Sequence, residues 1–175
     1  MGTVHSGGGR APNGRWVPVV RPKGHEPLRV VCVAQRYRCF ATHYCAGIGT
    51  VACLEDACPH CAHGLPLRHD GFLAACYPRT WEPVVVGLTQ SACADLLTLA
   101  AAEKGLRSLY VVLQRVRNAS NGQVAVVEYE RLRLANVPPE WDITPQVFRT
   151  LGLSCRGRPV EVFPFLDSGE EGGAP

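Results

Sequence analysis

A histidine and three cysteines in one short segment constrain this sequence more than any other feature. Their spacing is His43-x9-Cys53-x4-Cys58-Pro59-His60-Cys61. Structural zinc sites use four tetrahedral ligands, commonly thiolates with one imidazole, and the gap between Cys58 and Cys61 lets both sulfurs face one ion. The segment is rich in Gly, Pro and charge and has little core of its own, so something other than core packing must order it. The sequence predicts one structural Zn²⁺ per chain, with the ligands His43, Cys53, Cys58 and Cys61.

The fourth ligand and the role of the thiols have alternatives. For the fourth ligand, His63 and then Cys45 are the next candidates after His43, and His60 is a further alternative. The cysteines are alternatively unliganded core thiols. A third interpretation is redox catalysis, because Cys-Pro-His-Cys is also an active-site sequence of thioredoxin-fold oxidoreductases, where the first thiol begins a helix directly after a strand. Here no apolar strand precedes the motif, and Gly64 and Pro66 follow it, which favours the metal site.

The cysteine count and the hydropathy pattern point to a soluble protein with reduced thiols. Nine cysteines is an odd number, and the N-terminal stretch lacks the apolar run of a signal peptide, so a disulfide framework is not expected. No segment has the roughly 18 consecutive apolar residues of a membrane-spanning helix. We therefore expect a cytoplasmic protein without a membrane partner.

Composition shifts along the chain predict three parts. Residues 1–27 are rich in Gly, Pro and Arg and are expected to be a flexible basic arm. Residues 28–165 form the predicted domain, with a zinc-binding loop at 43–69. Residues 166–175 are a small acidic tail, expected to be disordered.

Within the domain, β-branched and alternating apolar residues predict strands at 28–33, 36–42, 72–77, 84–88, 108–116 and 123–129. The last two form a hairpin because Asn121-Gly122 is a turn signal. A helix capped by Thr89 or Ser91 is expected to run to about Lys104 and to stop at Gly105. A short helix is expected to begin at Thr144. This order predicts a mainly β (α+β) fold, an OB-fold-like five-stranded barrel with one inserted helix and a zinc-binding loop.

The same residues carry a resemblance to a known family. A histidine after a strand, then a cysteine, then Cys58-Pro59-x-Cys61, inserted into an oligonucleotide-binding barrel, resembles the zinc-containing OB-fold single-stranded-DNA-binding proteins of the phage T4 type. The resemblance covers roughly residues 28–130, and Arg68 and the strand at 72–77 follow in a similar order. The spacers between ligands are shorter here, and a glycine-rich arm replaces a lysine-rich one. The resemblance implies binding of single-stranded nucleic acid, DNA in the first place.

That function needs a basic groove with aromatic side chains on which bases stack. Alternation along 36–42 predicts that Arg36 and Arg38 share one face of a strand, with Tyr37 on the other. For the aromatic residues the alternative is core packing, and for the arginines it is ordinary solvated surface. The candidate nucleic-acid-binding residues are Arg36, Tyr37, Arg38, Tyr44, Arg68, Tyr77, Arg79, Trp81, Arg115 and Arg117.

Enzymatic function is not expected. The sequence lacks a recognisable pair of nucleophile and base, and it lacks paired acids. A phosphate-binding loop is also absent, because Gly7-Gly8-Gly9 is followed by neither a helix nor a Lys-Ser/Thr pair. The main alternative to nucleic-acid binding is a zinc-stapled adaptor that binds other DNA-processing proteins as a subunit of a larger complex.

Overall fold

The computed structural model describes residues 17–24, 26–116, 123–152 and 161–162. Nine strands of the described residues join one sheet. Their bounds are β1 (Val19–Val20), β2 (Leu28–Cys32), β3 (Arg38–Cys45), β4 (Gly49–Ala52), β5 (Arg68–Cys76), β6 (Pro83–Leu88), β7 (Leu109–Arg115), β8 (Val124–Arg131) and β9 (Glu161–Val162). The helices are η2 (Glu55–Ala57), α1 (Pro59–Ala62), α2 (Gln90–Ala102), η4 (Leu134–Asn136) and α3 (Thr144–Thr150).

Strand β5 is the centre of the sheet. One edge of β5 pairs with β6 from Gly71 to Cys76. The other edge is shared by two strands in succession, because β3 pairs with residues 68–72 and β2 pairs with Ala75 and Cys76. β2 continues to β7 and then to β8. Residues 70–76 are all buried, as expected for a strand covered on both faces.

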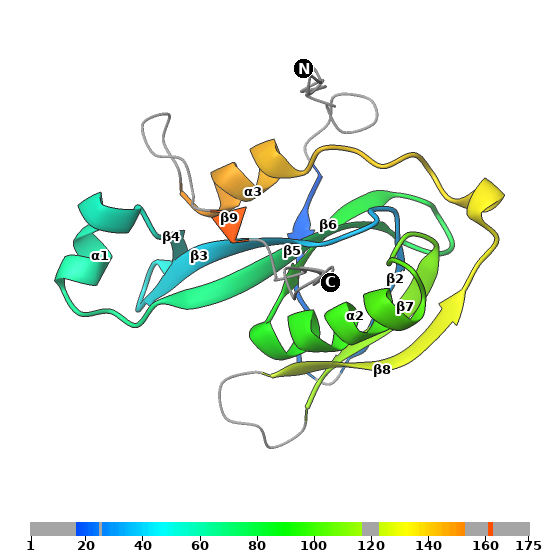
Figure 1. Ribbon diagram of the computed structural model, residues 1–175, viewed down its shortest axis with the longest axis horizontal. Coiled ribbons are helices and arrows are strands. Elements are labelled where there is room, and N and C mark those ends of the chain that lie inside the picture. Colours follow the sequence, from blue (N-terminus) through cyan, green and yellow to red (C-terminus); the bar gives the residue numbers. More distant parts are fainter. Residues whose placement is uncertain (1–16, 25, 117–122, 153–160, 163–175) are drawn as a thin grey trace, which may run out of the picture.

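Helices α2 and α3 cover opposite sides of this sheet, and the segment around α1 projects from one end (Figure 1). Alternation along β3 sends successive side chains to the two sides. Phe40 is buried on the α3 side, where its ring makes edge contacts with Phe72 and with Phe148 of α3. On the other side α2 buries Ala92, Cys93 and Leu96.

The sequence predicted the longer elements well. Helix α2 begins after Thr89, whose hydroxyl accepts a hydrogen bond from the Ala92 N–H at 3.4 Å, and Gly105 with φ of 120° follows its last turn. Strands β7 and β8 pair in antiparallel as expected, whereas the predicted turn at Asn121-Gly122 lies outside the described residues. Helix α3 begins at Thr144 with Pro145 in its first turn. Strand β3 begins at Arg38 instead of Arg36, because residues 34–36 form a bend.

The mainly β class is confirmed, but the described strands form an open sheet where a five-stranded barrel was expected. The path β1-β6-β5-β2-β7-β8 has two ends, and no pairing among the described residues joins β1 to β8. The predicted zinc-binding loop at 43–69 is also more ordered than expected, since it includes the end of β3, all of β4 and α1.

Part of the predicted N-terminal arm packs on the sheet. Val17 is buried, and β1 pairs in parallel with β6, with Val19 opposite Val85. Residues 1–16 and the predicted tail at 166–175 lie outside the described residues. Of the helices in the described part of the chain, none has the length and hydrophobicity needed to cross a bilayer.

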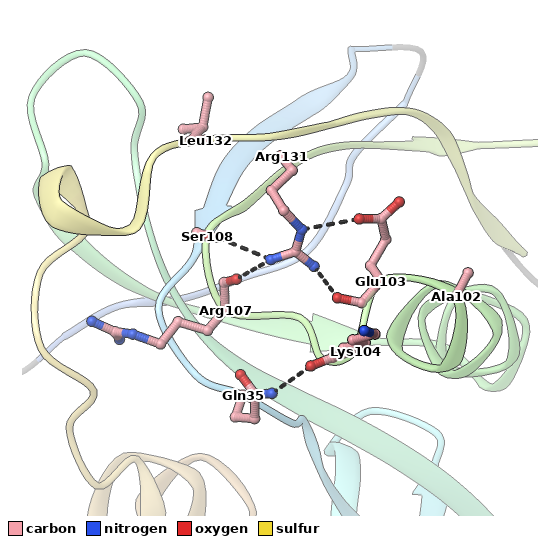
Figure 2. A pocket seen from close by; sticks show the side chains of 8 residues that line it. All are labelled: Gln35, Ala102, Glu103, Lys104, Arg107, Ser108, Arg131 and Leu132. Atoms are coloured by element: carbon pink, nitrogen blue, oxygen red, sulfur yellow. Dashed lines mark hydrogen bonds and ion pairs between the residues drawn. The ribbon is translucent and has the colours of Figure 1, made fainter.

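Arg131 of β8 connects this strand to the end of α2 through hydrogen bonds, beside a surface hollow of about 670 Å³ (Figure 2). Its Nε donates to the Glu103 carboxylate at 2.9 Å. Its two terminal nitrogens donate to the backbone carbonyls of Glu103, Gly105 and Arg107 and to the Ser108 hydroxyl. All five N–H groups are used, so this guanidinium stabilises the last turn of the helix and offers no donor to a ligand in the hollow.

We expect Arg131→Ala to lower the free energy of unfolding by about 1–2 kcal/mol, because the helix end loses charge-assisted hydrogen bonds from a side chain that is 38% exposed. Urea unfolding followed by circular dichroism measures the effect. The matched control is Arg133→Ala, an exposed arginine on the same segment, which should change stability by less than about 0.5 kcal/mol. Equal effects of the two substitutions would contradict this role of Arg131.

Candidate metal centre and exposed basic surface

Four side chains converge beyond the end of β3. The ligand atoms of His43, Cys53, Cys58 and Cys61 all lie within 4.8 Å of one another. These are the same four residues that the spacing predicted. They come from three places. His43 is near the end of β3, and Cys53 directly follows β4. Cys58 directly precedes α1, and Cys61 is the third residue of α1. This cluster can hold a metal ion.

The local backbone sets up this convergence. The Cys53 N–H donates to the Ala41 carbonyl at 2.9 Å, which holds the chain after β4 against β3. Cys58 has extended dihedral angles and is the N-cap of α1, with Pro59 in the first turn. The turn of helix that follows brings Cys61 to the same side as Cys58, and Gly64 with φ of 71° then reverses the chain.

His43 is completely buried and its ring is oriented by the backbone. Its Nδ1 lies 3.1 Å from the Pro66 carbonyl, which accepts only if Nδ1 carries the proton. Nε2 then keeps its lone pair, and it faces the Cys61 sulfur at 3.3 Å. A histidine that donates one ring N–H to a carbonyl and presents the other nitrogen has the usual arrangement of a metal ligand.

The thiols differ in acidity. Burial raises the pKa of Cys58, but hydrogen bonds from the backbone N–H groups of Leu54, Cys61 and His60 outweigh it and lower this pKa to about 6. A hydrogen bond shared with Cys53, whose sulfur lies 3.6 Å away, raises the pKa of Cys61 to about 11. Cys58 is therefore the more acidic of the two thiols, and an ion would displace the proton of Cys61.

The rival ligands occupy other positions. Cys45 and His60 contact each other, with the Cys45 sulfur 3.6 Å from His60 Nδ1, and His63 is exposed after α1. None of the three belongs to the four-residue cluster. The redox interpretation also loses its structural basis, because α1 has only four residues and a 3-10 turn, not a strand, precedes Cys58.

The predicted nucleic-acid contacts do not share one groove. At the end of the sheet near the metal cluster, Tyr44 is 55% exposed and the Arg68 guanidinium carbon lies 5.9 Å from the centre of its ring. Arg79 and Trp81 are exposed in the turn after β5, at the opposite end of that strand from Arg68. Arg115 is exposed at the end of β7, and Arg117 lies outside the described residues.

Three of the remaining candidates pack in the core or bond to other parts of the fold, and the fourth, Arg36, lies outside β3. Tyr37 is buried in the core, so its ring has no face open to a base, and Tyr77 is partly buried against the same core. Arg38 donates to the Thr144 hydroxyl at 2.7 Å and lies 3.7 Å from Asp142. Arg36 is exposed in the bend before β3 and does not share a strand face with Arg38. The expected basic face at 36–38 is therefore absent from β3.

Two exposed apolar residues in the segment between Tyr44 and Arg68 were not predicted. Ile48, in the turn between β3 and β4, is 77% exposed, and Leu67, just before β5, is 53% exposed. The only sequence signal was an apolar residue inside a Gly/Pro-rich segment. We use the term end surface for Tyr44, Ile48, Leu67 and Arg68.

Comparison of the chain with family models, with curated protein sequences and with solved structures gives no match. The resemblance to phage single-stranded-DNA-binding proteins thus stays a prediction from the motif.

We expect one metal ion per chain in protein purified without chelators, and we expect Cys58→Ser and His43→Ala to lose it, because each removes one of four ligands. Loss of the ion should disorder the segment around α1, since binding energy at such a site is largely folding energy. Elemental analysis measures the stoichiometry.

Cys45→Ser and Cys76→Ser are the controls for this prediction. Both remove a buried thiol outside the four-residue cluster and should keep the ion. Loss of metal from Cys45→Ser with retention in His43→Ala would assign the fourth ligand to Cys45 instead.

Proposed function

We propose that this protein binds single-stranded nucleic acid, DNA in the first place, through the end surface, and that a structural zinc ion orders the segment that supports this surface. The observation that carries the proposal is the exposed pair of Tyr44 and Arg68. An exposed aromatic ring and an adjacent guanidinium form the combination that stacks a base and neutralises its phosphate.

Zinc is the ion that suits the cluster best. Three thiolates and one imidazole form a complete tetrahedral set, which zinc prefers and which hard ions such as Mg²⁺ and Ca²⁺ do not. Four protein ligands also leave no position for a reactive water, so the proposed role is structural and the proposed function is not catalytic.

The metal segment is connected to both members of the pair. His43 is the neighbour of Tyr44 in β3. The Pro66 carbonyl, which accepts the hydrogen bond of His43 Nδ1, lies two residues before Arg68. An ion held by His43 would therefore fix the backbone on both sides of the exposed pair, which supports a preformed contact with nucleic acid.

Tyr44→Ala should weaken binding of a labelled single-stranded oligonucleotide by roughly fivefold to a hundredfold, since stacking is worth about 1–3 kcal/mol per base. Duplex binding, which depends on phosphate contacts, should hardly change. Fluorescence anisotropy measures both. Tyr129→Ala is the matched control, because Tyr129 is similarly exposed, at 48%, but lies on β8 between Glu128 and Glu130. Equal wild-type affinity for duplex and single strand would count against the proposal.

A second candidate function is a protein adaptor, and the exposed apolar side chains of Ile48 and Leu67 favour it. Exposed apolar residues, together with an exposed aromatic ring and an arginine, are also typical of the centre of a protein interface. The two functions differ in their electrostatics, because phosphate binding releases counterions and an apolar interface does not.

Salt dependence separates the two candidates. If the end surface binds nucleic acid, affinity should fall steeply between about 50 and 200 mM salt. Arg68→Ala should reduce the slope of log affinity against log salt concentration by roughly the amount expected for one phosphate contact. An adaptor surface would instead lose affinity for its protein partner in Ile48→Asp and Leu67→Asp with little response to salt. Absence of any single-strand binding at about 50 mM salt would favour the adaptor.

A further inference from the structure

A second pair of thiols lies away from the metal cluster, between β3 and α2. Cys39 of β3 is directly opposite Gly71 of β5. Gly71 has no side chain, and a Cβ placed on it would lie 2.4 Å from the sulfur of Cys93. The sulfur of Cys93 therefore occupies the position where the cross-strand neighbour of Cys39 would have its side chain. Such neighbours have Cβ atoms about 4.5–5.5 Å apart.

The two thiols interact with each other and are shielded from solvent. Cys39 is 8% exposed and Cys93 is 7% exposed. The hydrogen bond from Cys93 lowers the pKa of Cys39, against the opposing effects of burial and of the Asp70 carboxylate. The same hydrogen bond, together with burial, raises the pKa of Cys93. Cys39 is thus the more acidic of the two thiols.

We propose that Cys39 and Cys93 are an oxidation site, distinct from the metal cluster, at which hydrogen peroxide converts two thiols into an intramolecular disulfide between β3 and α2. The contact through Gly71 supplies the required proximity, and peroxide is small enough to reach thiols that are nearly buried. This inference does not depend on nucleic-acid binding.

The chemistry balances in two steps. The Cys39 thiolate attacks one peroxide oxygen, the O–O bond breaks, and Cys39 becomes a sulfenic acid while hydroxide leaves and takes up a proton to become water. The sulfur of Cys93 then attacks the Cys39 sulfur, the S–O bond breaks, and the leaving oxygen takes the Cys93 proton as the second water. In total, two thiols and one peroxide give one disulfide and two waters.

The cross-link would enclose the metal segment. All four residues of the metal cluster lie between positions 39 and 93 in the sequence. Because a disulfide restricts the unfolded chain across the loop that it closes, oxidation should raise the thermal stability of the domain. It would also join α2 covalently to the strand that carries His43.

The test uses the full-length, metal-loaded protein. Folded protein is treated with about one equivalent of hydrogen peroxide, remaining thiols are alkylated, and the protein is digested without reduction for mass spectrometry. We expect a Cys39–Cys93 cross-linked peptide, a Tm raised by several degrees and reversal of both by a reductant. Cys93→Ala and Cys39→Ala should each abolish the cross-link and the rise in Tm while keeping the metal ion.

Cys32 and Cys76 provide a matched comparison. They are fully buried on adjacent strands, but the register places Cys32 opposite Ala75 and Cys76 opposite Val31, so their side chains point to opposite faces. Cys76→Ala should leave the Cys39–Cys93 cross-link unchanged. Recovery of Cys39 and Cys93 as alkylated thiols from peroxide-treated protein, with or without oxidation of the metal cluster, would overturn the proposal without bearing on the end surface.

Discussion

The backbone hydrogen bonds of β5 hold the whole sheet together. This strand pairs with β6 on one edge and, on the other, first with β3 and then with β2. In the part of the chain that the structure describes, the strands that lead to β8 and those that lead to the metal cluster therefore pair with each other only through β5. Its first residue, Arg68, comes directly after the segment that contains α1. The register of the central strand therefore depends on whether that segment is well ordered.

Local sequence signals were sufficient where the structure depends on neighbours in the chain. Thr89 and Gly105 delimit α2 because caps act within one turn, and the β7–β8 hairpin follows from two alternating runs with a short connection. The four residues of the metal cluster were also predictable, since ligand chemistry and spacing restrict the combinations that can surround one ion.

Features that depend on distant parts of the chain were not predictable in the same way. β1 has two residues and β4 has four, too few to show a period, and each exists because a longer strand offers it an edge. Tyr37 lies between two arginines and Tyr44 between His43 and Cys45, yet Tyr37 is buried in the core and Tyr44 is exposed near the turn of the β3–β4 hairpin. The open sheet likewise depends on which distant strands pair with one another, which no local pattern records.

Alternation along β3 separates two kinds of chemistry. Cys39, His43 and Cys45 lie on one face, whereas Arg38, Phe40 and Tyr44 lie on the other. The sulfur and imidazole groups are thus on the side of α2 and the metal cluster, and the exposed aromatic ring is on the side of α3. Since the strand backbone stands between them, an ion or an oxidant acting on the first face can affect the second only through the backbone, by changing how firmly β3 and the residues before Arg68 are held. A change of metal occupancy should therefore alter the order of the Tyr44–Arg68 pair without adding or removing a group that a ligand would touch.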